Sequence, residues 1–156
     1  MGTVQHYFKT RDQMLAFALA YNNELLTQRV QRLFAVSPPP DSSRAAFRMV
    51  LAELLPLNEQ SRAGARLGAA ILARGAVDPL VVDTVRMTYE GLTDFLVRHL
   101  RLARDAGALP DDTDLDHAAR YLNAVIDGLR WPALFGVNSE EEVLAVLDDH
   151  LARLFG

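Results

Sequence analysis

Apolar residues recur at helical intervals through almost the whole of this 156-residue sequence. The clearest example lies near the C-terminus, where apolar residues alternate at spacings of three and four: Leu115, Ala118, Leu122, Val125 and Leu129. Such spacing places a narrow apolar stripe along a helix that packs against another helix. Alternating runs of β-branched residues, the signal of strands, are few. The sequence therefore predicts an all-α fold.

Capping residues and prolines divide this pattern into six expected helices. The six ranges are Thr10 to the proline-rich segment 37–41, about 42–55, about 58–74, about 78–106, from Thr113 or Asp114 to a kink or stop at Trp131-Pro132, and from Ser139 to the chain end. Thr10 with Gln13, and Ser139 with Glu142, have the spacing of capping boxes. Gly75 is expected just beyond the third helix as its C′ residue. No sign of a second globular domain or of a long linker is present.

Composition and charge exclude several classes of function. The net charge of −4 argues against a surface that binds nucleic acid throughout, because phosphate neutralisation needs a dense basic patch. The absence of cysteine removes thiolate metal sites and cysteine nucleophiles. Neither a signal peptide nor an apolar run of transmembrane length is evident. A cytoplasmic protein without a membrane partner is the resulting expectation.

Residue patterns that carry catalysis or hold cofactors are also missing from the sequence. The four histidines, His6, His99, His117 and His150, do not have the spacing of metal ligands. The acidic run at 111–116 lacks the glycine and distal glutamate of a calcium loop and suits the start of a helix. Nucleophile elbows and phosphate-binding loops are absent. We therefore expect no enzyme activity, no metal and no cofactor.

Asn123 and Asp127 form the most informative polar pair within the apolar pattern. Because they lie four residues apart, they share one face of the fifth expected helix, close to its apolar stripe. Such a pair is typical of ligand cavities, which are mostly apolar and contain a few placed polar groups. A solvated helix edge and a polar contact between two helices remain equally open interpretations.

The first fifteen residues, "MGTVQHYFKTRDQML", resemble the end of the DNA-binding region in the TetR/AcrR family of transcriptional regulators. The matching order is a glycine, a hydroxyl residue and an apolar residue, then an aromatic pair, a short turn and a basic residue that opens a long helix. Gly2, Thr3, Val4, the pair Tyr7-Phe8 and Arg11 occupy these positions, whereas Gln5 stands where the family usually has tyrosine. The rest of the chain is similar in architecture to the family's ligand-binding and dimerisation domain.

The resemblance implies two regions and a set of DNA-contacting residues. Residues 1–11 would be the remnant of a helix-turn-helix domain, and residues 12–156 the C-terminal ligand-binding and dimerisation domain. In an intact relative the DNA-contacting residues would be Thr3, Gln5, His6, Tyr7 and Arg11. Two further helices precede the recognition helix in the family and are expected to be missing here. Since an isolated short helix is unstable in water, we expect weak order before Thr10 and impaired specific operator binding.

A homodimer that responds to a small, largely apolar effector is the function that the resemblance implies, with repression as the expected outcome. Candidate pocket residues are Phe17, Tyr21, Met49, Met87, Tyr89, Phe95, Tyr121, Asn123, Asp127 and Trp131. Candidate dimer-interface residues are Leu115, Leu122, Val125, Ile126, Leu129, Val143, Val146, Leu147, His150, Leu151 and Leu154. The last two helices could instead direct these apolar stripes into the core of one protomer. A helical dimerisation module without a small ligand is the alternative function.

Overall fold

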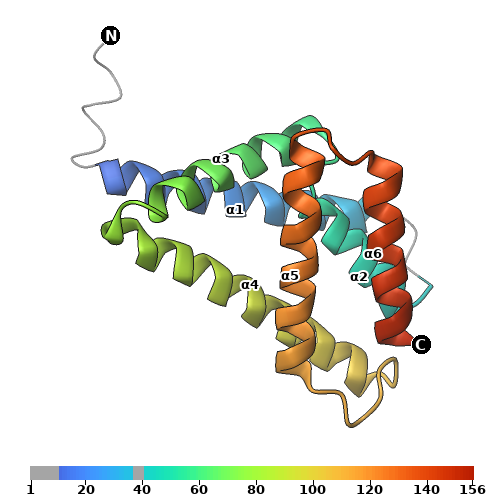
Figure 1. Ribbon diagram of the computed structural model, residues 1–156. Coiled ribbons are helices and arrows are strands. Elements are labelled where there is room, and N and C mark those ends of the chain that lie inside the picture. The colour runs from blue at the N-terminus through green and yellow to red at the C-terminus, as the bar shows by residue number, and fades with distance from the viewer. Residues whose placement is uncertain (1–10, 37–40) are drawn as a thin grey trace.

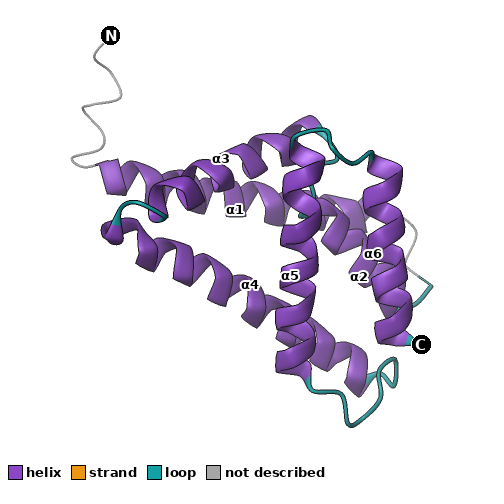
Figure 2. Cartoon of the chain, viewed as in Figure 1, coloured by secondary structure: helices purple, strands orange, loops and turns teal. Residues whose placement is uncertain are grey.

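The computed structural model describes residues 11–36 and 41–156, and these residues form six helices and no strand (Figure 2). The helices are α1 (Arg11–Val36), α2 (Ser43–Glu53), α3 (Glu59–Gly75), α4 (Pro79–Asp105), α5 (Leu115–Leu134) and α6 (Glu140–Phe155). The predicted all-α fold with six helices is confirmed, and the boundaries agree within a few residues. No helix among the described residues is both long enough and apolar enough to span a membrane.

Side-chain caps fix the starts of four helices. Ser42, Asn58, Asp114 and Ser139 each accept a hydrogen bond from the backbone N–H three residues later. At α6 the predicted capping box is present, because the Glu142 carboxylate also accepts a hydrogen bond from the Ser139 backbone N–H at 2.8 Å. The hydrogen bond from the Ser139 backbone N–H, together with the Ser139 side chain, lowers the pKa of the Glu142 carboxyl group. The expected Thr10 cap lies outside the described residues.

Glycine and proline mark several helix ends, with two corrections to the sequence prediction. Pro132 lies inside α5, which continues to Leu134 and does not stop at Trp131-Pro132. Gly107 adopts a φ of 72° after α4, and its neighbour Ala108 donates a backbone hydrogen bond to Ala103, as in a Schellman motif. Gly75, in contrast, is the last residue of α3 and not the predicted residue beyond it. A Cβ there would lie 2.9 Å from the Val85 Cγ2 atom, so this glycine permits close packing of α3 on α4.

The core lies mainly between α2, α5, α6 and the C-terminal half of α4. Its fully buried members include Leu51, Leu96, Leu122, Ile126 and Leu147. In Figure 1, α1 and α3 run together on one side, and α4 diverges from them before it crosses α5. As a result, α5 contacts α3, α4 and α6, and it is the central helix of the fold.

Two ion pairs connect α2 to its neighbours. On one side, the Arg29 Nε of α1 donates to a Glu53 carboxylate oxygen at 2.9 Å, and both side chains are largely buried. On the other side, Arg48 forms a two-point contact with Asp148 of α6 at 2.5 and 3.1 Å. The ring of Phe47 packs against Phe155 next to this second pair. These contacts attach α1 and α6 to opposite sides of α2.

Replacing Ser139 by alanine tests the contribution of the α6 cap. The variant loses the acceptor for the Glu142 N–H, so the free energy of unfolding should fall by about 1 kcal/mol. Chemical denaturation of the two proteins measures the difference. Ser43→Ala is a suitable comparison, because Ser43 lies in the first turn of α2 next to the cap residue and should change stability by less than about 0.5 kcal/mol.

Candidate functional site

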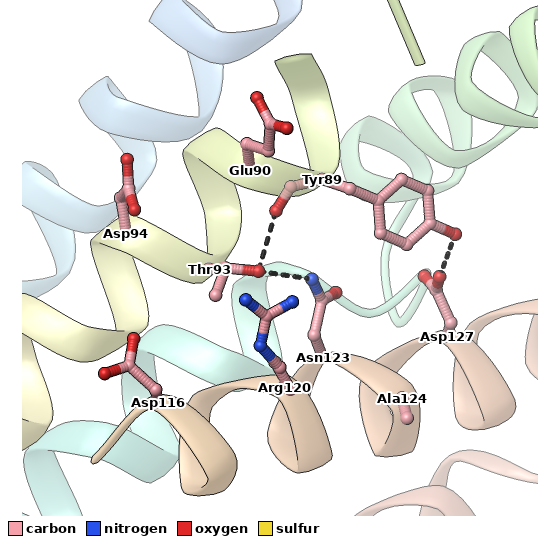
Figure 3. Close-up of a pocket in the computed structure, with 9 residues that line it drawn as sticks. All are labelled: Tyr89, Glu90, Thr93, Asp94, Asp116, Arg120, Asn123, Ala124 and Asp127. Carbon is pink, nitrogen blue, oxygen red and sulfur yellow. Dashed lines mark hydrogen bonds between the residues drawn. The ribbon is translucent and has the colours of Figure 1, made fainter. Parts of the chain in front are cut away.

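A groove of about 500 Å³ lies between α4 and α5 and is the candidate site (Figure 3). It is lined from α4 by Tyr89, Glu90, Thr93 and Asp94, and from α5 by Asp116, Arg120, Asn123, Ala124 and Asp127. Helical geometry brings these residues together, since positions three or four apart on each helix face the same side. We call this surface the α4–α5 groove.

Asn123 is the buried polar residue of the α4–α5 groove, with a residual exposure of 5%. Its side-chain nitrogen donates to the Thr93 hydroxyl oxygen at 3.3 Å. The Thr93 hydroxyl in turn donates its single proton to the Tyr89 carbonyl at 2.8 Å, so it can only accept from Asn123. This chain of hydrogen bonds fixes the orientation of the amide and leaves the buried Asn123 Oδ1 without a hydrogen-bond partner among the described residues.

Asp127 connects the α4–α5 groove to the core. One of its carboxylate oxygens accepts a hydrogen bond from the Tyr89 hydroxyl, and the other contacts the Arg130 Nη1 at 2.6 Å. Arg130 also donates from Nε to the Leu54 carbonyl at 3.3 Å, at the end of α2. We call these contacts the Tyr89–Asp127–Arg130 network. It links α4, α5 and α2 through the largely buried Asp127 and Arg130 and the partly exposed Tyr89.

Burial and the hydrogen bond to Asp127 raise the pKa of Tyr89 to about 12. Because the folded pKa exceeds the usual value of about 10, folding favours the protonated phenol. This contribution to stability is complete below pH 10 and should be lost as the pH rises through 12. We expect Tyr89→Phe to lack this part of the alkaline stability loss.

Ultraviolet titration of phenolate absorbance in wild type and Tyr89→Phe should isolate Tyr89 as the difference between the two curves. The expected midpoint of that difference is about 12. A midpoint near the ordinary tyrosine value would show that neither burial nor Asp127 acts on the phenol. Tyr121→Phe is the matched control, since the 54% exposed Tyr121 contacts His150 at the junction of α5 and α6 and does not line the α4–α5 groove.

The α4–α5 groove contains three of the ten predicted pocket residues: Tyr89, Asn123 and Asp127. Of the others, Phe17 and Tyr21 stack on each other on an exposed face of α1, and Met87 is 71% exposed. Phe95 packs on His99, Met49 is half-buried on α2, and Trp131 stacks with Arg130. Tyr121 contacts His150 at the junction of α5 and α6, not the groove.

Sequence reasoning missed the remaining groove residues, which are Glu90, Thr93, Asp94, Asp116, Arg120 and Ala124. A usable signal existed on α5, where Asp116, Arg120, Asn123 and Asp127 follow one another at spacings of three and four. On α4 no comparable signal distinguishes Glu90 and Asp94 from an ordinary solvated face. The lining is therefore more polar than the expected apolar cavity.

Burial changes the assignment of most of the predicted interface residues. Seven of the eleven are buried within one protomer: Leu115, Leu122, Ile126, Leu129, Val143, Leu147 and Leu151. A side chain enclosed by its own protomer cannot contact a second one, so these seven belong to the core. Val125, His150 and Leu154 are half-buried, and Val146 is 50% exposed. Only these four remain candidates for an interface.

The predicted DNA-contacting residues Thr3, Gln5, His6 and Tyr7 lie outside the described residues. Arg11 begins α1, and its side chain is likewise not described. The division into residues 1–11 and 12–156 stays a prediction, because residues 1–10 lie outside the described part of the chain.

Comparison with known proteins identifies the family. The profile of the family described as "BetI-type transcriptional repressor, C-terminal" matches residues 43–156. The HTH-type transcriptional regulator PksA of Bacillus subtilis is 25% identical over 134 residues, which are 86% of this chain. The chain spans 62% of the length of PksA.

Two solved structures from Rhodococcus share the fold of this chain. A transcriptional regulator from Rhodococcus sp. Rha1 matches with a TM-score of 0.74 and 26% identity, covering 97% of this chain and 76% of the other. A TetR-family protein from Rhodococcus sp. matches with a TM-score of 0.84 and 18% identity, covering 98% and 79%, and this likeness concerns the fold alone.

The fold, the family match over most of the chain and these relatives define a regulator domain and not an enzyme. The chain belongs to the TetR family of transcriptional regulators, within the group of BetI-type repressor C-terminal domains. The predicted membership of the TetR/AcrR family is thereby confirmed.

Proposed function

We propose that this chain is the effector-binding and dimerisation part of a cytoplasmic, ligand-responsive repressor that works as a homodimer. The observation that carries the proposal is the position of α5. One side of this helix lines the α4–α5 groove, and another side lies next to α6 at the protein surface. A ligand that changes how α5 packs on α4 would therefore act on a helix that also faces the partner.

An exposed strip along α5 and α6 supports the dimer. The ring of Tyr121 on α5 lies 4.9 Å from the ring of His150 on α6, with Val146 one turn away from His150. Burial lowers the pKa of His150, which favours its neutral form in this mainly apolar strip. Gly128, two turns beyond Tyr121, has no atom within 4 Å of the place where a Cβ would be. A two-fold axis through this strip would bring two copies together as an isologous pair.

Val146→Asp tests the proposed dimer, because a carboxylate in the strip would lose hydration on association. Val77→Asp is the matched control, since Val77 is 80% exposed in the turn between α3 and α4, away from the strip. Light scattering after size exclusion should show a dimer for wild type and Val77→Asp and a monomer for Val146→Asp. A monomeric wild type at high concentration would refute the homodimer.

Effector action in this proposal is a shift between two arrangements of the protomers. A ligand in the α4–α5 groove can favour one arrangement only by binding it more tightly than the other. The Tyr89–Asp127–Arg130 network supports such coupling, because it joins the groove to the end of α2. Operator contacts would come from Thr3, Gln5, His6, Tyr7 and Arg11 together with the helices that precede them in the family.

A thermal-shift screen tests whether an effector exists, since a ligand that binds the native state raises its melting temperature. The screen should contain apolar, anionic, neutral polar and cationic small molecules. We expect at least one class to raise the melting temperature of wild type. If every class fails while the dimer persists, the chain is instead a helical dimerisation module without a small-molecule ligand.

A further inference from the structure

Negative charge accumulates along the α4–α5 groove. Glu90 and Asp94 on α4 and Asp116 on α5 line it, and none of the three has an ion-pair partner among the described residues. Arg120 is the single cationic residue of the lining. Asp127, the fourth carboxylate, is already paired with Arg130. The groove therefore has an excess of carboxylates over cations, which favours a positively charged ligand.

A second, independent feature points to a hydrogen-bond donor on that ligand. Asn123 lines the groove, and its buried Oδ1 has no hydrogen-bond partner among the described residues. Leaving a buried acceptor unpaired costs about 1–3 kcal/mol relative to a paired one. Rotation of the amide cannot relieve this, because Thr93 already donates its proton to Tyr89 and requires the Asn123 nitrogen as its donor. An N–H group from a ligand would satisfy the acceptor.

We propose that the α4–α5 groove binds a small molecule that carries a protonated primary amine. The inference rests on the proposed function, because it assigns a chemical class to the effector of that site. One ammonium donates an N–H to the Asn123 Oδ1, and a second ammonium at the other end of an aliphatic chain is balanced by Asp94 and Asp116. A quaternary ammonium has the same charge and no N–H, so it leaves Asn123 unpaired. A neutral alcohol can donate a hydrogen bond to the Asn123 Oδ1, but it carries no positive charge to balance the carboxylates of the groove.

A divalent metal ion is a poorer match for this groove. No group of three or more histidine, aspartate or glutamate side chains in the described part of the chain is placed to hold one. In Figure 3 the carboxylates of Asp94 and Asp116 lie at one end of the groove and Asn123 lies further along α5. Asn123 lies seven positions beyond Asp116, or about 10 Å along the helix axis. An aliphatic chain with an amine at each end suits this spacing better than a compact ion.

The test is isothermal titration calorimetry on the full 156-residue chain at low ionic strength. The three probes are diaminobutane, its fully N-methylated form with the same charge, and butanediol with the same length and no charge. For wild type we expect diaminobutane to bind at least about tenfold more tightly than either of the other two. Equal affinity for diaminobutane and its N-methylated form would overturn the role of Asn123 and with it the proposal.

Charge-neutral variants supply the control within the protein. Asp94→Asn with Asp116→Asn should reduce the affinity for diaminobutane at least about tenfold, because both exposed carboxylates line the groove. Glu140→Gln with Glu141→Gln removes the same charge from the exposed start of α6 and should leave binding unchanged. An equal loss in both double variants would overturn the proposal, since it would show only an effect of net charge.

Failure of the inference and failure of the proposed function give different results. If diaminobutane does not bind but another class in the thermal-shift screen raises the melting temperature, the amine proposal is wrong and an effector still exists. If neither diaminobutane nor any class in the screen binds, the amine proposal is wrong and so is the proposal that the chain binds a small-molecule effector.

Discussion

Leu147→Ala is expected to lower the free energy of unfolding by about 2–5 kcal/mol. Leu147 is completely buried in the cluster formed by α2, α4, α5 and α6. Truncation removes favourable burial of the side chain and leaves a cavity that its neighbours fill only in part. Urea denaturation followed by circular dichroism measures the change as a shift of the midpoint at constant slope.

Val146→Ala is the matched control for Leu147→Ala, because the two residues are adjacent on α6 and differ in burial. Val146 is 50% exposed and should change the stability of the protomer by less than about 1 kcal/mol. Comparing the two variants also shows whether Leu147 belongs to the core of the protomer or to a dimer interface. If Leu147→Ala weakened association while protomer stability stayed at the wild-type value, Leu147 would be an interface residue after all.

Asp127→Ala should destabilise the protein by about 3–5 kcal/mol, because it leaves a largely buried guanidinium without its carboxylate. The Arg130 and Asp127 side chains are only 18% and 16% exposed. The variant also removes the acceptor of the Tyr89 hydroxyl, so the contact between α4 and α5 loses a hydrogen bond. Thermal and urea unfolding at neutral pH measure the loss.

Asp149→Ala provides the comparison for Asp127→Ala. Asp149 pairs with Arg153 at the same 2.6 Å, but those side chains are 67% and 77% exposed. Solvent screening should limit its effect to about 0.5 kcal/mol. Replacing both Asp127 and Arg130 by apolar residues should recover part of the stability lost in Asp127→Ala. If Asp127→Ala lowers the free energy of unfolding no more than Asp149→Ala does, burial of the ion pair does not strengthen it.

Most of the fold could be predicted from the sequence because its signals are local. Caps such as Ser139 with Glu142, stops such as Gly107 and the proline-rich segment, and three-and-four spacing each act within a few residues. Gly75 was misassigned because its role is not local. Its missing side chain makes room for Val85 of the next helix, and no pattern around Gly75 shows that contact.

The site could be predicted only in part, because it depends on which helix faces meet. Asn123 and Asp127 stood out as polar residues beside an apolar stripe, whereas Glu90 and Asp94 belong to a face that looks solvated in isolation. The stripes of α5 and α6 posed the same difficulty. Their spacing shows that Leu122 and Leu147 are buried, but spacing alone does not show whether the protomer or a partner covers them.

The ion pair between Arg29 and Glu53 joins α1 to α2 at a point well away from the N-terminal end of α1. Arg29 also donates to the Glu53 backbone carbonyl at 3.4 Å, so two hydrogen bonds connect the two helices at this point. From Arg29 to the start of α1 at Arg11 the helix extends about 27 Å. A tilt of α1 by about 5° about this contact would therefore move the N-terminal end of α1 by roughly 2 Å. We therefore expect a small rotation of α2, which contacts Asp148 of α6 through Arg48, to produce a larger displacement at the N-terminal end of α1.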